Sequence, residues 1–219
     1  MGKMTLSQMV AQLAGGMGTS IQIFVVTLVF SLPLGLIVAF GRMTKNGFLR
    51  NLVKVYISIM RGTPLMLQLM VVYFGPYYLF GIRVGSGYRL WATFIGFVIN
   101  YAAYFAEIYR SGIQSMPQGQ YEAAYILGYS RFQTFFKIIL PQVIKRILPS
   151  ITNEVITLVK DTSLAFTLSV VGMFSVAKAL ASSQTSMIPF VAAGLFYYIF
   201  NLIVACTMEW MEKKLEYYR

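Results

Sequence analysis

Residues 20–40 read SIQIFVVTLVFSLPLGLIVAF, an apolar run that contains no Asp, Glu, Lys or Arg. The hydrocarbon core of a bilayer is roughly 30 Å thick and a helix rises about 1.5 Å per residue, so a span needs about 20 apolar residues. Pro33 does not argue against a helix, because neighbouring groups can satisfy the carbonyl that a proline leaves unpaired in a membrane. The stretch therefore predicts a transmembrane helix.

The composition of the whole chain agrees with a membrane protein. Of its 219 residues 58% are hydrophobic and 11% are charged, whereas soluble domains average about 45–50% apolar and about 25% charged. Disorder is excluded for the same reason. The chain has no histidine and one cysteine, Cys206. These counts exclude an internal disulfide and leave no histidine for a zinc site, a haem or a catalytic triad.

Four further stretches have the length and apolar character of spans, and we expect them at residues 52–80, 90–109, 148–171 and 189–211. The first of these four is interrupted at Gly62-Thr63-Pro64. The predicted fold is a single all-α integral membrane domain over residues 1–219, with five transmembrane helices. Residues 1–18 have apolar residues near helical spacing. They are either a segment in the membrane interface, hinged at residues 15–18, or a frayed terminus.

Lysines and arginines are distributed unevenly between the two sides that five spans define. One side holds Arg42, Lys45, Arg50, Lys54, Arg110, Arg131, Lys137, Lys145, Arg146, Lys213, Lys214 and Arg219, and the other holds Lys3, Arg83, Arg89 and Lys178. The side richer in these residues is expected in the cytoplasm, which puts the N-terminus outside and the C-terminus inside. The net charge of +11 then indicates contact with anionic headgroups, and we expect no nucleic-acid partner.

The longest connection on the predicted cytoplasmic side is about residues 110–147. Pro117 suits the first turn of a helix and Gly128 suits the left-handed position that ends one, so we predict a short helix over residues 118–127. A second helix is expected over residues 131–140, ending at Pro141. The first helix could insert into a groove on a soluble partner. It could equally pack against its own membrane domain.

Several motifs in and around this connection resemble those of a known family. Glu122-Ala123-Ala124, followed by Gly128 and by IILP at residues 138–141, resembles the EAA motif of ABC importer permeases. Segments that resemble the polar amino acid permeases among them are RGTP at 61–64, YFAEIYRSGI at 104–113, PQGQ at 117–120 and KDTSL at 160–164. The resemblance implies a type I ABC importer permease fold, and a transport subunit rather than an enzyme.

The same resemblance implies partners. The helix near residues 118–128 would be the coupling helix, which docks on an ATPase through Gln120, Glu122, Ala123, Ala124 and Gly128. The implied partners are two ATP-binding cassette ATPase subunits, a second permease copy in a homodimer, and an extracellular substrate-binding protein. ATP and Mg would be bound by the ATPase, with no cofactor in this chain. The sequence agrees in containing no Gly-x-x-x-x-Gly-Lys-[Ser/Thr] loop.

Polar side chains inside the predicted spans mark a candidate substrate site, because charged groups in lipid are costly and face the interior. Glu154 and Asp161 are seven residues apart and share a helix face. The candidate substrate-binding residues are Ser58, Arg61, Gly62, Thr63, Asn100, Tyr104, Asn153, Glu154, Thr157, Leu158, Asp161 and Ser163. No metal-ligating or catalytic set is expected.

Two interpretations of these charges remain open. Arg61 and Lys160 could pair with carboxylates and hold the bundle together, or the charges could bind a ligand. For Glu107 we expect a structural pair with Arg110, its i+3 neighbour. The two-carboxylate face favours a basic amino acid such as arginine, lysine or histidine. An ion channel subunit is the alternative function, but no TVGYG-like filter is present and the cytoplasmic helix would be unexplained.

Overall fold

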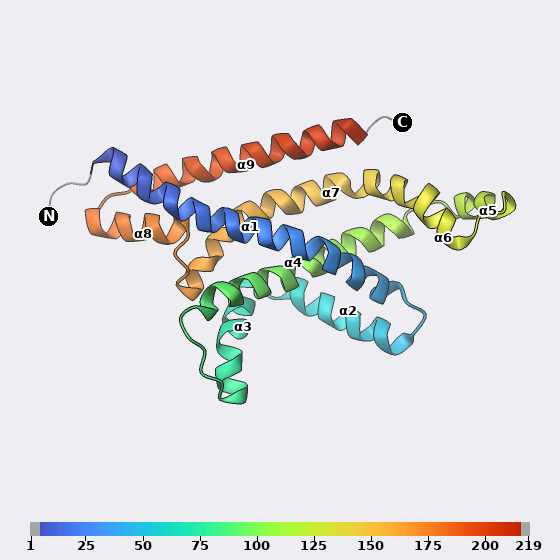
Figure 1. Ribbon diagram of the computed structural model, residues 1–219, viewed down its shortest axis with the longest axis horizontal. Coiled ribbons are helices and arrows are strands. Elements are labelled where there is room, and N and C mark those ends of the chain that lie inside the picture. Colours follow the sequence, from blue (N-terminus) through green and yellow to red (C-terminus); the bar gives the residue numbers. More distant parts are fainter. Residues whose placement is uncertain (1–4, 216–219) are drawn as a thin grey trace.

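The computed structural model describes residues 5–215, which are helical apart from short connections and contain no β-strand (Figure 1). Lys3 and Arg219 lie outside the described residues. The elements are α1 (Leu6–Met43), α2 (Gly47–Gly62), α3 (Leu65–Phe80), α4 (Tyr88–Gln114), α5 (Gln118–Ile126), α6 (Arg131–Gln133), the π-helix η1 (Thr134–Ile139), α7 (Leu140–Asp161), the 3₁₀ helix η2 (Thr162–Leu168), α8 (Met173–Gln184) and α9 (Ile188–Leu215). The all-α prediction is confirmed.

Three helices, α1, α4 and α9, are each long and apolar enough to cross a membrane. Two further candidate spans are bent: α2 and α3 meet at 113°, and the segment Arg131–Leu168 meets α8 at 61°. The number of membrane spans reaches the expected five if each bent pair is one span. In Figure 1 the helices α1, α7 and α9 run roughly along the longest axis, with α8 near the left end and α5 at the right end.

The first helix is continuous, so the predicted hinge at residues 15–18 is wrong. α1 runs without a break from Leu6 to Met43. Gly16 serves close packing instead, because a Cβ atom there would lie 2.9 Å from the Cα of Met173 in α8. A residue without a side chain is needed at this contact to let the two helices approach.

The predicted break at Gly62-Thr63-Pro64 separates two helices. Proline disfavours helical torsions in the residue before it, and Thr63 is extended with φ −123° and ψ 149°. The chain then turns into α3, which Figure 1 shows projecting away from the long helices. The predicted span 52–80 is thus a bent pair with its corner at Thr63.

α4 lies at the centre of the bundle and packs against α1, α2, α3 and α7. Its side chains Phe97, Tyr101 and Phe105 are among the largest fully buried ones. Close approach to α1 depends on Gly35, where a Cβ atom would come within 2.8 Å of the Phe105 Cβ. Because α4 touches four neighbours, polar groups on it can meet residues from distant parts of the sequence.

The segment after α4 contains the predicted short helix, α5, and Gly128 follows it with φ 77°. This left-handed conformation confirms the predicted helix end. The expected stop at Pro141 is wrong, because the chain continues from α6 through η1 into α7. In η1 the Leu140 N–H bonds to the Phe135 carbonyl, five residues back. The wider turn of a π-helix gives the proline ring room that a regular helix lacks.

The predicted span at 148–171 is helical as far as Leu168, but its last part is a 3₁₀ helix. α7 ends at Asp161, the more tightly wound 3₁₀ helix η2 continues to Leu168, and Ser169 takes a left-handed conformation with φ 57°. Side-chain hydroxyls bond to the backbone here, with Thr162 Oγ1 donating to the Val159 carbonyl at 2.8 Å. Such bonds compete with regular helix. The chain therefore bends, and α8 forms an element that periodicity did not reveal.

Candidate functional site

A cavity of about 280 Å³ lies where the corner between α2 and α3 faces α4 and α7. The residues that line it are Thr63, Pro64, Leu65, Asn100, Tyr101, Tyr104, Glu154, Thr157, Asp161 and Leu164. Six of the predicted candidates are among them: Thr63, Asn100, Tyr104, Glu154, Thr157 and Asp161. The packing of the bundle thus brings together polar residues from three separate segments.

Two carboxylates face this cavity from α7. Glu154 and Asp161 lie two helical turns apart on one face, and both line the cavity. Tyr101 on α4 donates its hydroxyl hydrogen to Asp161 Oδ2 at 2.7 Å. The Tyr101 ring is 2% exposed and stacks on Phe97 with an interplanar angle of 4°. Asp161 is therefore held in place by a rigid aromatic partner.

A positive charge lies against one of the aromatic residues that line the cavity. Arg61, in the last turn of α2, has its guanidinium carbon 5.3 Å from the centroid of the Tyr104 ring. This is within the range of a cation–π contact. Tyr104 itself lines the cavity. Arg61 thus stacks on an aromatic residue of the cavity wall, but it is itself exposed and does not line the cavity. Lys160, on α7, is also exposed.

An amide pair fixes the corner of the cavity. Asn100 Nδ2 donates to the Met60 carbonyl at 3.0 Å and to Gln68 Oε1 at 2.9 Å. Gln68 Nε2 in turn donates to the Met60 carbonyl at 3.0 Å and to Thr63 Oγ1 at 2.8 Å. These bonds tie α4 to both sides of the α2–α3 break. Both bonds use the amide N–H groups of Asn100, so the role of Asn100 is to hold the corner between α2 and α3 in position.

The other predicted site residues lie elsewhere. Ser58, Gly62 and Asn153 are exposed, Leu158 is fully buried in the core, and Ser163 is half-buried on η2. None of these five is among the residues that line the 280 Å³ cavity within the described range 5–215. Leu158 was expected near the face of Glu154 and Asp161, but the structure turns its side chain into the core.

The sequence interpretation missed Tyr101, Pro64, Leu65 and Leu164, which also line the cavity. A signal for Tyr101 was present, because it precedes Tyr104 by three residues and so lies on the same helix face. The apolar members carry no such signal. Their place in the wall follows from the bend at Thr63 and from the end of α7.

The residues of the predicted coupling helix divide between two faces of α5. Gln120 exchanges two hydrogen bonds with Gln142, at 2.8 and 2.6 Å, and Ala124 is buried. Glu122 and Ala123 are exposed. At the end of α4, the expected pair is confirmed, since Arg110 Nη2 lies 2.6 Å from Glu107 Oε2. α5 therefore rests on the chain by one face and presents the other outward.

Comparison with known proteins identifies the family. The family described as "Binding-protein-dependent transport system inner membrane component" matches residues 31–217. The chain belongs to this family. The arginine transport system permease protein ArtQ of Bacillus subtilis is 35% identical over 92% of this chain and 91% of that protein. The L-cystine transport system permease protein TcyB of the same organism is 33% identical over 94% and 87%.

A solved structure shares the fold. A crystal structure of an amino acid ABC transporter with histidines contains a chain that superposes with a TM-score of 0.86 at 27% identity, covering 98% of this chain and 100% of the other. The protein is thus a multi-pass permease subunit of an amino acid ABC importer in the inner membrane, and not itself an enzyme. The ion-channel alternative is set aside by this membership.

Proposed function

We propose that this permease carries a basic amino acid, such as arginine, lysine or histidine, through the cavity between α3, α4 and α7. The observation that supports the proposal is the pair of carboxylates, Glu154 and Asp161, on one wall of that cavity. A cavity of about 280 Å³ is smaller than the roughly 300–1,000 Å³ of pockets for drug-sized ligands. It suits a single amino acid.

The charges of the site suggest how such a substrate would lie. Arginine and lysine carry two positive groups and one carboxylate at neutral pH, and histidine does so when its imidazole is protonated. Its cationic groups would face Glu154 and Asp161, and its carboxylate would face Arg61, whose guanidinium lies over Tyr104. Attraction between unlike charges is stronger in a cavity than in bulk water, because the effective dielectric constant is lower. A substrate without the side-chain cation would leave one carboxylate unpaired, at a cost in binding.

The proposed partners follow from the same membership. Two ATPase subunits would bind ATP and Mg and move α5, whose outward face includes Tyr125 and Ile126, exposed by 82% and 83%. Exposed apolar side chains in such numbers are typical of a docking surface. A binding protein would deliver substrate from outside. The lysine- and arginine-rich side would face the cytoplasm, so the N-terminus would be outside and the C-terminus inside.

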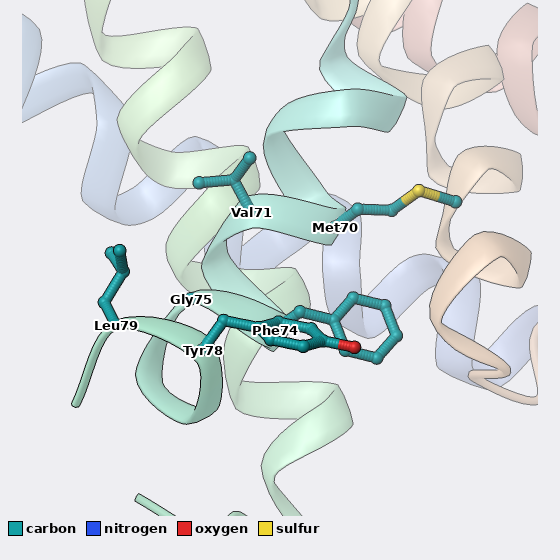
Figure 2. A pocket seen from close by; sticks show the side chains of 6 residues that line it. All are labelled: Met70, Val71, Phe74, Gly75, Tyr78 and Leu79. Carbon is teal, nitrogen blue, oxygen red and sulfur yellow. The ribbon is translucent and has the colours of Figure 1, made fainter. Parts of the chain in front are cut away.

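A second permease copy in a homodimer would complete the pathway. The proposal is supported by the outer face of α3, where Figure 2 shows a hollow lined by Met70, Val71, Phe74, Gly75, Tyr78 and Leu79. This hollow measures about 420 Å³ and its side chains are almost entirely apolar. A C2 dimer needs one self-complementary patch on each copy, and α3 offers an apolar surface outside the chain's own core.

Uptake by the reconstituted transporter tests the substrate class. We expect Glu154→Gln and Asp161→Asn each to lower the uptake of labelled arginine by tenfold or more, since loss of a charge-assisted bond costs about 1.5–3 kcal/mol. Glu209→Gln, an exposed glutamate on α9, is the control and should transport normally. Unchanged arginine uptake in both cavity variants would remove the proposal. ATP hydrolysis by the reconstituted complex, measured alongside, shows whether the variants are still coupled to the ATPase.

A further inference from the structure

A second, larger hollow lies at the opposite end of α7 from the candidate site. It measures about 890 Å³ and is bounded by the turn between α4 and α5, by α5, and by η1 with the first turns of α7. Lys137, Lys145 and Arg146 bring three cationic groups to it, and Met116, Ile138 and Pro141 form an apolar part of its wall. Among the described residues that line it there is no carboxylate.

One of these cations is already held in place. Arg146 Nη1 donates to the Ser115 carbonyl at 2.6 Å and lies 3.1 Å from the Ser115 hydroxyl. These two bonds use one nitrogen of a guanidinium that carries five N–H donors in a planar fork. A guanidinium group that is already held in place loses little conformational entropy when it binds an oxyanion, and the geometry of its N–H groups matches that of a phosphate. The reciprocal bonds between Gln120 and Gln142 hold the α5 wall against α7.

The membrane end of the hollow fits the headgroup layer. Arg146 comes two residues before the apolar stretch that begins at 148, which is about 3 Å along a helix, whereas Lys137 is about 16 Å from the same point and lies on the cytoplasmic side of the headgroup layer. The headgroup region of a bilayer covers several ångströms on each side of the hydrocarbon. The hollow also lies on the side rich in lysine and arginine. Basic pockets between helices on this side are suited to phosphate-bearing headgroups.

We propose that this pocket binds the phosphate of an anionic lipid headgroup from the cytoplasmic leaflet. Arg146 contacts the phosphate oxygens, Lys137 faces the polar end of the headgroup, and Met116 and Pro141 form the apolar wall beside it. The apolar wall favours a lipid over an acidic side chain of the ATPase, whose proposed docking face is the outer surface of α5. The proposal rests on the membrane orientation given under the proposed function and is independent of the substrate.

Because the pocket is bounded by the turn between α4 and α5, by α5 and by α7 together, a bound lipid would fix α5 relative to the span that follows it. Stiffening of this contact would improve the transmission of movement from the ATPase to the helices. We therefore expect anionic lipid to raise the amount of substrate transported per ATP hydrolysed, in addition to any effect on the insertion of the transporter into the membrane.

The test uses the complete transporter with its ATPase, purified and exposed to mixed phosphatidylglycerol and phosphatidylcholine. Retained lipid is measured by native mass spectrometry. We expect a preference for phosphatidylglycerol that falls about 30-fold in the double variant Lys137→Gln/Arg146→Gln, about fivefold for each cation. The control Lys45→Gln/Arg50→Gln removes the same charge from exposed positions on the same side and should keep the preference. The single variant Lys137→Gln, at an exposed position, should lower the preference about fivefold and serves as the test if the double variant does not fold.

Three results would overturn the proposal. The first is an equal preference for phosphatidylglycerol in the pocket variant and in the control. The second is displacement of the lipid by millimolar inorganic phosphate, which would make the site one for a soluble anion. The third is loss of the ATPase from the Lys137→Gln/Arg146→Gln complex with lipid preference intact, which would assign the pocket to a subunit contact. Failure of arginine uptake in the cavity variants leaves this proposal unaffected.

Discussion

Replacement of Gly35 by alanine tests whether close contact between α1 and α4 builds the bundle around the cavity. A Cβ atom at Gly35 would lie 2.8 Å from Phe105 Cβ, 3.0 Å from the Ala102 carbonyl oxygen and 3.3 Å from the Ala106 amide nitrogen. Two of these atoms belong to the backbone of α4, so no side-chain rotation relieves the clash. The two helices must separate, which shifts the helix that carries Asn100 and Tyr101.

The magnitude follows from two opposing effects. Overpacking of a well-packed interior typically costs about 1–3 kcal/mol, while alanine favours helix over glycine by up to about 1 kcal/mol. We expect Gly35→Ala to lose about 1–2 kcal/mol of stability. Gly18→Ala on the same helix is the matched control, because no heavy atom lies within 4 Å of an added Cβ there. That variant should be as stable as the parent protein or slightly more stable.

Thermal unfolding of the purified transporter in detergent, followed by circular dichroism, measures the difference. For a chain of this length 1 kcal/mol corresponds to about 2–4 °C, so the Gly35→Ala midpoint should fall by about 2–8 °C. The binding of substrate should weaken in the same variant. If the Gly35→Ala protein unfolds at the same temperature as the Gly18→Ala protein, the inference that the packing of α1 on α4 depends on this contact is refuted.

Two further predictions concern the corner of the cavity and the outer face of α5. Asn100→Leu removes the bonds from α4 to Met60 and Gln68 and should lower stability by about 1–3 kcal/mol. A double-mutant cycle with Gln68→Leu should show a coupling energy of about 0.5 kcal/mol or more. Strictly additive losses of stability would contradict the inference that Asn100 and Gln68 hold the corner together. Glu122→Arg should prevent co-purification of the ATPase while Glu209→Arg, the same charge change on α9, should not. Retention of the ATPase by the Glu122→Arg protein would contradict docking at this face.

Local features of the fold were predictable because their causes lie within a few residues. The uncharged run at 20–40 is long enough for a span by itself, and α1 contains it. Gly128 ends its helix because its φ of 77° suits a residue without a Cβ atom. Spacing on one helix also placed Glu154 and Asp161 on a common face. Both line the cavity, together with four other residues chosen for their polarity inside spans.

The sequence by itself determined that the chain lies in a lipid bilayer, that its fold is all-α, and which polar residues lie within spans. These properties depend on composition and on periodicity along a single helix. Only the tertiary structure decided which of those residues meet. Tyr101 and Asp161 are 60 residues apart, and Gln68 and Asn100 are 32 apart. Their contacts depend on the 113° bend between α2 and α3 and on the packing of α4 and α7. Helical periodicity gives the face of each helix, but the neighbour across that face is chosen by the close packing of all the helices together.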